Sequence, residues 1–143
     1  MDDVNNPFLD SLGIRLVRWE HSLAEFSLTL EERHLNRQQI LQGGVIATLL
    51  DAACGYAGLF GSDGRAPLHA STLSLSLNFV AALRDGSLRA VGRRSGGGRN
   101  IFFSEGQLYA DDGKLVATAQ GVFKYRPPAQ TERPATPQAT RRA

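Results

Sequence analysis

Residues 36–58 of the chain read NRQQILQGGVIATLLDAACGYAG, and this stretch decides the fold. From Gly43 to Gly58 it predicts a helix that is apolar on nearly every side, with one carboxylate, Asp51, in its middle. A helix that is hydrophobic all round belongs in the interior of a protein. Because it is short, glycine-rich and charged, it does not fit a bilayer span, which needs about 20 apolar residues. The stretch therefore predicts a buried central helix that carries an acid where a charge is costly.

The segments before this helix alternate apolar and polar residues, which is the period of half-buried β-strands. Residues 14–16 and 23–30 show this alternation, and residues 7–12 predict a short helical turn. Residues 31–41 form a polar connection without a clear period. Two strands therefore precede the helix.

Four strands are predicted after the helix. The clearest, TLSLSLNFV at residues 72–80, places the leucines and Phe79 on one face and Thr72, the serines and Asn78 on the other. The remaining signals are a strand that starts at residues 88–91 and is interrupted at 95–98 (SGGG), and strands at 101–110 and 115–125 joined by the hairpin signal Asp112-Gly113. Consecutive strands joined by short turns imply a mainly antiparallel sheet, so the fold class is α+β.

At 143 residues the chain is expected to form one domain with its own core. We place this domain at residues 1–126 and a flexible tail at residues 127–143, because the tail holds four of the six prolines and almost nothing apolar. Residues 126–143 carry a net charge of +3 against +2 for the whole chain, so the other 125 residues carry −1. A nucleic-acid binder usually has a basic domain face, and this distribution argues against one.

Two further features concern the compartment. A single cysteine, Cys54, cannot form an intrachain disulfide and fits a reducing environment. The first residues, MDDVNNP, lack the basic start and apolar run of a signal peptide. We expect a cytoplasmic protein without a membrane partner.

Asp51 and the glycine pair Gly43-Gly44 are the candidates for chemistry. Asp51 has no cation three or four positions away. It either points along a solvated stripe of the helix or acts as a general base or nucleophile in a semi-buried pocket. The glycines are either a tight turn or an oxyanion hole, because the first N–H groups of a helix lack intrahelical partners and glycine lets a carbonyl oxygen approach them.

The distance between these candidates has a consequence. Gly43 and Asp51 are eight residues apart, which is about 12 Å along a helix. Attack requires the reacting atoms to lie within about 3.5 Å of each other. Both residues can act on one carbonyl only if they come from different chains, so the site hypothesis predicts a dimer.

The chain resembles the PaaI-type hotdog-fold acyl-CoA thioesterases over about residues 8–126. The resemblance lies in the pattern of the strand that begins at residue 72 and in the spacing of six positions. These positions are Asn36, Gln42, Gly43, Gly44, Asp51 and Thr72. It implies a hotdog fold, in which an antiparallel sheet wraps around one long central helix. It also implies an enzyme that hydrolyses an acyl-CoA thioester.

By the same resemblance, Asp51 activates water against the thioester carbon or attacks that carbon directly, and Thr72 orients the water or the acid. The N–H of Gly43, assisted by Asn36, polarises the thioester carbonyl, with Gly44 in the substrate-binding set. The two halves of the site come from opposite subunits of a homodimer. A homotetramer of paired dimers rests on the resemblance alone.

The departure from the family pattern is Gln42, which stands where the family has His. Glutamine donates and accepts hydrogen bonds but does not titrate near pH 7. If the family's His positions the substrate, Gln42 replaces it with modest loss; if it relays a proton, activity is poor. Because Asp51 is retained, we expect an active enzyme. The alternatives are a hotdog protein that binds acyl-CoA without cleaving it and a hydratase, against which the missing His counts.

Arg93, Arg94 and Arg99 cluster around the glycine-rich segment and have two interpretations. They form a solvated strand edge or a clamp for the phosphates of coenzyme A. Cys54, one turn after Asp51, is interpreted as a small buried hydrophobe rather than a nucleophile. The three histidines have no metal-ligand spacing, so we expect no metal and no cofactor other than the coenzyme A of the substrate.

Overall fold

The computed structural model describes residues 6–127, so most of the predicted tail lies outside the described residues. The elements run in the order α1 (Pro7–Leu12), β1 (Arg15–Glu20), β2 (Leu23–Thr29), the 3₁₀ turn η1 (Glu32–His34), α2 (Gly43–Tyr56), β3 (His69–Phe79), β4 (Ser87–Gly97), β5 (Ile101–Ala110) and β6 (Leu115–Arg126). The predicted order of two strands, one long helix and four strands is confirmed.

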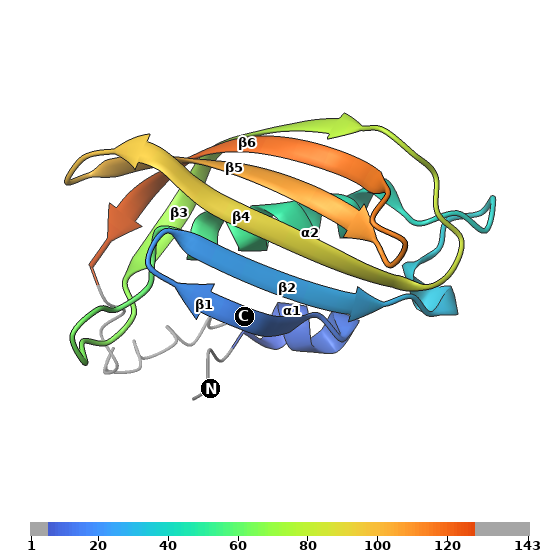
Figure 1. Ribbon diagram of the computed structural model, residues 1–143, viewed down its shortest axis with the longest axis horizontal. Helices are drawn as coiled ribbons and strands as arrows, with labels where there is room; N and C mark the ends of the chain where they lie inside the picture. The colour runs from blue at the N-terminus through green and yellow to red at the C-terminus, as the bar shows by residue number, and fades with distance from the viewer. Residues whose placement is uncertain (1–5, 128–143) are drawn as a thin grey trace, which may run out of the picture.

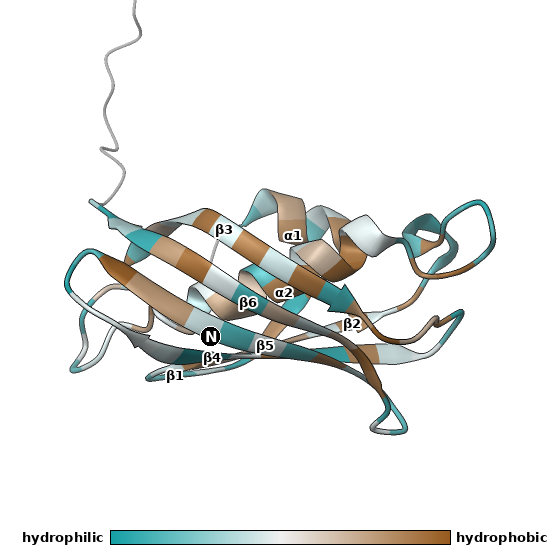
Figure 2. Ribbon diagram, turned by 90° about the horizontal axis from the view of Figure 1, so that it is seen from above, coloured by the Kyte–Doolittle hydropathy of each residue, from teal (hydrophilic) through white to brown (hydrophobic). Residues whose placement is uncertain are grey.

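All six strands of the described part join one sheet in which neighbouring strands are antiparallel. Their order is β1-β2-β4-β5-β6-β3, so β1 and β3 are the edge strands. The sheet curves around α2, which contacts β2, β3, β4, β5 and β6 (Figure 1). Figure 2 shows α1 and α2 on the same side of the sheet. The predicted antiparallel sheet around one central helix is confirmed.

The helix α2 is buried on the side that faces the sheet, where Leu49, Leu50 and Ala53 have no exposed surface. It ends at Tyr56, two residues before the predicted end, and tighter turns carry the chain on to Leu59. Within residues 6–127, none of the helices has the length and apolar character that crossing a membrane requires.

Two glycines that face each other let α2 lie close to the sheet. Gly92 on β4 pairs with Gly106 on β5. A Cβ on Gly92 would collide with the carbonyl oxygen of Ala53, and one on Gly106 would lie 2.8 Å from Sγ of Cys54. Larger residues at these two positions would push the helix out of the curve of the sheet.

The facing pattern predicted for residues 72–80 is wrong at its start. The pairing of β3 with β6 shifts between Thr72 and Ser74, so Leu73 is the extra residue of a β-bulge. The bulge reverses the alternation and leaves Thr72 on the helix side together with Leu75, while Leu73 is 51 % exposed. Without the bulge, Thr72 and Leu75 would lie on opposite faces of the sheet.

The interruption predicted at residues 95–98 is also wrong, because β4 continues to Gly97. A register shift after Arg94 accommodates Ser95 as a second bulge, and pairing with β5 then resumes. Gly97 has a φ of 136°, and a Cβ there would lie 2.5 Å from the carbonyl oxygen of Ile101. Gly97 therefore lets β4 continue to the tight turn that leads into β5.

A buried histidine fixes the connection that leads into α2. The side chain of His34 is fully buried, and its Nδ1 accepts the backbone N–H of Glu31 at 2.9 Å. Its Nε2 lies 2.7 Å from the carbonyl oxygen of Leu12. Because Nδ1 accepts a hydrogen bond, the proton of the neutral ring is on Nε2, which donates to this carbonyl. The backbone carbonyl of His34 accepts the N–H of Gln42 at 2.9 Å. One residue thus joins α1, η1 and the start of α2.

Candidate active site

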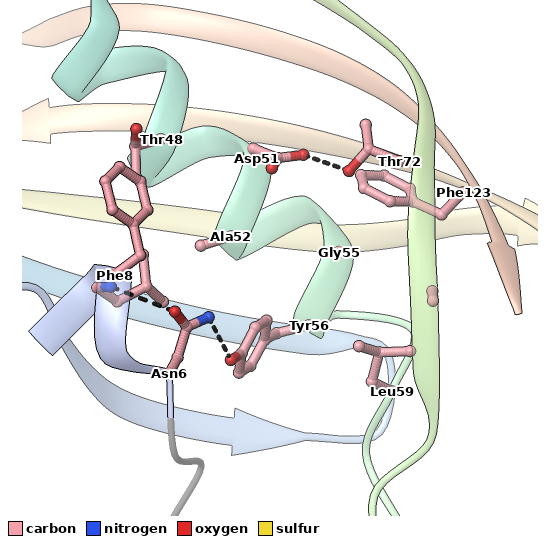
Figure 3. A pocket seen from close by; sticks show the side chains of 12 residues that line it. Asn6, Phe8, Thr48, Asp51, Ala52, Gly55, Tyr56, Leu59, Thr72 and Phe123 are labelled. Carbon is pink, nitrogen blue, oxygen red and sulfur yellow. Dashed lines mark hydrogen bonds between the residues drawn. The ribbon is translucent and has the colours of Figure 1, made fainter. Parts of the chain in front are cut away.

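The carboxylate of Asp51 points toward the edge strand β3 (Figure 3). The hydroxyl of Thr72 donates a 2.7 Å hydrogen bond to Oδ1 of Asp51, and the bulge at Leu73 is what turns that hydroxyl toward the helix. The other carboxylate oxygen, Oδ2, has no hydrogen-bond partner among residues 6–127. A carboxylate held at one oxygen and open at the other can take a proton from water or attack a carbonyl carbon.

A cavity of about 200 Å³ lies beside this carboxylate. Its walls come from α1, α2, β3 and β6, and the larger apolar side chains that line it are Phe8, Leu9, Tyr56, Leu59 and Phe123. The polar side-chain groups among its lining residues are those of Asn6, Thr48, Asp51 and Thr72 and the hydroxyl of Tyr56. A cavity that combines apolar side chains with a carboxylate at its edge is suited to hold an apolar group next to a reacting carbonyl.

Of the residues that line this cavity, only Asp51 and Thr72 were predicted from the sequence as site residues; those missed include Asn6, Phe8, Thr48 and Tyr56. Thr48 precedes Asp51 by three positions, and residues at that spacing share a helix face, so it could have been found. Asn6 and Phe8 approach α2 only through the packing of α1, and nothing in their local sequence indicates that contact.

The N-terminus of α2 presents donors without acceptors. Gln42 is the N-cap residue, and its carbonyl accepts the N–H groups of Val45 and Ile46 at 3.0 and 3.4 Å. The N–H groups of Gly43 and Gly44 find no acceptor within residues 6–127. They carry the positive end of the helix dipole, so an oxygen with developing negative charge is stabilised there.

Asn36 lies near this helix end but uses its side-chain oxygen within its own loop. Its Oδ1 accepts the backbone N–H groups of Gln38 and Ile40 at 2.8 and 3.3 Å. Asn36 and Gln42 line the same open depression of about 900 Å³. The side-chain amide of Asn36 is therefore held in a fixed loop beside the exposed side chain of Gln42.

The chain thus brings the predicted residues together in two groups rather than one. Asp51 and Thr72 are hydrogen-bonded and line the cavity of about 200 Å³. Asn36 and Gln42 line the separate depression at the helix N-terminus, and neither they nor Gly43 border that cavity.

The three arginines do not form one cluster. Arg93 and Arg94 are consecutive residues of β4, so their side chains leave opposite faces of the sheet. Arg94 lies over the ring of Phe102 at 5.9 Å on the helix side, whereas Arg99 is exposed in the turn between β4 and β5. A clamp made by Arg93 and Arg94 of a single chain is incompatible with this arrangement, and a role in phosphate binding stays a prediction.

Cys54 lies on the sheet side of α2, where it has no exposed surface. Burial, with smaller contributions from the charges of Asp51 and Glu105, raises the pKa of its thiol to about 12. Because the thiolate is the reactive form, a thiol with this pKa is inert near neutral pH. Its predicted role as a small buried hydrophobe agrees with its position.

Comparisons with known proteins place this site in context. Residues 38–117 match the model of the thioesterase superfamily. The chain is 31 % identical over 121 residues to the Pseudomonas aeruginosa protein named "Putative esterase PA0474", a match that covers 83 % of this chain and 88 % of that protein.

Solved structures share the fold. The conserved protein PA5202 of Pseudomonas aeruginosa is similar with a TM-score of 0.76 at 28 % identity, covering 85 % of this chain and 94 % of that one. The PaaI protein of E. coli, from the phenylacetic acid degradation operon, is similar with a TM-score of 0.76 at 20 % identity, covering 86 % of each chain. At that identity the PaaI likeness shows the fold alone. The hotdog fold predicted from the sequence is confirmed.

Proposed function

Because the chain belongs to the thioesterase superfamily, we propose that it hydrolyses an acyl-CoA thioester to the free acid and coenzyme A. The observation that carries this proposal is the hydrogen-bonded pair of Asp51 and Thr72 at the edge of a cavity that apolar side chains line in part. The cavity suits the acyl group, and the carboxylate of Asp51 borders it, so the thioester carbon of a bound acyl group would lie beside that carboxylate.

In the proposed reaction, Asp51 takes a proton from a water molecule as that water attacks the thioester carbon. The bond from Thr72 holds one carboxylate oxygen in place and leaves the other open for the proton. The tetrahedral intermediate then breaks at its carbon–sulfur bond, and the leaving sulfur of coenzyme A receives the proton from Asp51. Direct attack by Asp51 on the same carbon is the other course open to this carboxylate.

The oxyanion of that intermediate is proposed to bind the N–H of Gly43, flanked by Gly44, at the α2 N-terminus of a second copy of the chain. Two copies are needed because Gly43 and Asp51 of one helix are about 12 Å apart. Asn36 and Gln42 beside that helix end are proposed to hydrogen-bond the thioester oxygen or the first atoms of coenzyme A.

The edge strand β3 supports a dimer. It is an unpaired edge of the sheet in the described chain. Leu73 and Phe79 on β3 and Val80 directly after it are 51, 60 and 56 % exposed. A long edge strand with exposed apolar side chains is a surface that another chain covers. Pairing β3 with β3 of a second copy would cover this edge, on which Leu73 adjoins Thr72. Three expectations stay predictions. They are the association of two such dimers into a tetramer, a cytoplasmic location, and phosphate contacts from Arg99.

A second candidate function is binding of acyl-CoA without cleavage, and Gln42 is the observation that favours it. A glutamine cannot relay a proton, so this protein would lack a step if the family's His has that role.

A panel of acyl-CoA esters, assayed with a thiol reagent and by calorimetry, separates the two candidates. Release of thiol from at least one ester supports the enzyme, and Cys54 does not contribute to the signal because it is buried. Measurable binding of several esters without thiol release would favour the binding protein.

A further inference from the structure

A second cavity adjoins the one that borders Asp51. It measures about 190 Å³, and its lining combines the apolar side chains of Ile14, Leu16 and Phe26 with the charged side chains of Asp10 and Arg15. The two cavities share the three lining residues Asn6, Leu9 and Tyr56. These three residues therefore form the partition between the cavities.

One part of this partition is fixed and another can open. Leu9 is 5 % exposed and belongs to the hydrophobic core. The ring of Tyr56 packs against Trp19 and Phe26, with centroid distances of 5.4 and 5.1 Å. Asn6 closes the remaining gap, because its Nδ2 donates a 3.2 Å hydrogen bond to the hydroxyl of Tyr56 (Figure 3). Asn6 is thus the member that can move without unpacking the core.

We propose that the Asn6–Tyr56 pair closes the inner end of the acyl pocket and restricts the substrate to short acyl groups. This inference rests on the proposed thioesterase function. The cavity beside Asp51 measures about 200 Å³, which is small for a ligand pocket, since such pockets usually measure about 300–1,000 Å³.

The path of the acyl group follows from the positions of the lining residues. With its thioester carbon at Asp51, the chain extends along Ala52 and Gly55 and ends at the ring of Tyr56. A longer chain that continues past Tyr56 meets the second cavity, whose walls are apolar at Ile14, Leu16 and Phe26 and charged at Asp10 and Arg15. The hydrogen bond between Asn6 and Tyr56 opposes that entry.

The test compares butanoyl-CoA with decanoyl-CoA in the wild type and three variants. Asn6→Ser keeps an oxygen that can cap α1, a role in which Oδ1 of Asn6 accepts the N–H of Leu9 at 3.2 Å, but its shorter side chain cannot reach Tyr56. Tyr56→Phe removes the same hydrogen bond and keeps the ring. Ser11→Ala, on the same helix but outside both cavities, is the matched control.

We expect the ratio of kcat/KM for decanoyl-CoA to that for butanoyl-CoA to rise about tenfold in Asn6→Ser, the scale on which pocket size discriminates apolar substrates. Tyr56→Phe should raise it less, and Ser11→Ala should leave it unchanged. A ratio that stays at the wild-type value in both pocket variants, while butanoyl-CoA is hydrolysed, overturns the inference but not the proposed function.

Dissociation constants of the two esters, measured in parallel by calorimetry, distinguish a failure of this inference from a failure of the proposed thioesterase function. If no ester is cleaved, the proposed hydrolysis fails. The partition is then supported by tighter relative binding of decanoyl-CoA in Asn6→Ser and overturned by an unchanged ratio of the two constants. If neither ester binds, both ideas are overturned.

Discussion

The first and third turns of α2 carry the two halves of the candidate site, and they are built differently. The first turn offers backbone donors at Gly43 and Gly44, at the end of a connection that buried His34 holds. The third turn offers the side chain of Asp51, whose orientation depends on Thr72 of the edge strand. One half is fixed by the backbone and survives most substitutions, whereas the other depends on two side chains and one bulge. Each half is incomplete alone, which is why the proposed site lies between two copies.

The largest effect is expected at the side-chain half. Asp51→Asn keeps the shape of the residue and a hydrogen-bond acceptor for Thr72 but removes the base and nucleophile. We expect kcat for a cleaved acyl-CoA to fall by about a hundredfold or more, the usual contribution of a general base. Steady-state thiol release measures this loss. Turnover at the wild-type level would remove Asp51 from the mechanism.

The backbone half is tested by a substitution that removes only an N–H group. Gly43→Pro fits the local structure, because Gln42 before it has a ψ of 132° and proline is favoured at the first helical position. We expect kcat to fall by about a hundredfold, as for the loss of one oxyanion donor.

Gly43→Ala is the matched control for this variant. It keeps the N–H and adds a Cβ about 3.5 Å from the ring of Phe79, an ordinary contact. Equal losses of kcat in the proline and alanine variants would show that the space at Gly43 matters and its N–H does not.

A smaller effect is expected at Thr72 of β3, the residue that orients the carboxylate of Asp51. Thr72→Val keeps the size of the side chain and removes the hydrogen-bond donor to Asp51. Because the lost hydrogen bond goes to a charged group, we expect kcat/KM to fall about tenfold. Thr72→Ser retains the hydroxyl and should stay near the wild type. Similar kcat/KM values for the valine and serine variants would contradict an orienting role.

The smallest effect is expected on the sheet side of the same helix. Cys54→Ala should leave kcat unchanged, because this thiol is buried with a pKa of about 12 and points away from the cavity. A large loss of kcat in a folded Cys54→Ala variant would mean that the thiol takes part.

The same thiol gives a pH dependence of stability with a defined sign. Its pKa is raised from an ordinary value of 9.0 to about 12, so between these pH values the unfolded chain ionises while the folded chain does not. The free energy of unfolding should therefore fall as pH rises through this range, by about 1 kcal/mol per pH unit. Urea unfolding from pH 8 to 10.5 should show this decrease in the wild type and a shallower one in Cys54→Ala. Parallel curves would contradict the raised pKa.

The parts of the fold that the sequence predicts are those decided by local pattern. The apolar run from Gly43 identifies α2, and the Asp112-Gly113 turn is present with Gly113 at a φ of 85°. The position of Thr72 could not be predicted from β3 alone, because its residues alternate without a break. The bulge at Leu73 arises from pairing with β6, which the alternation does not encode.

The candidate site divides in the same way. Asp51 and the glycines at the helix start stand out because a charge and two glycines are unusual in an apolar helix. The inner end of the cavity could not be predicted, since Asn6 and Tyr56 are fifty residues apart and meet only when α1 packs against α2. Contacts of that kind depend on tertiary packing and leave no local pattern.

The most direct test of a site shared between subunits is to mix two inactive variants. Asp51→Asn and Gly43→Pro chains, coexpressed in equal amounts, should form heterodimers in which one site carries both substitutions and the other carries neither. Random pairing then predicts recovery of about a quarter of the wild-type activity. If each chain instead held a complete site of its own, every site in the mixture would carry one substitution, and activity would stay at the level of the single variants.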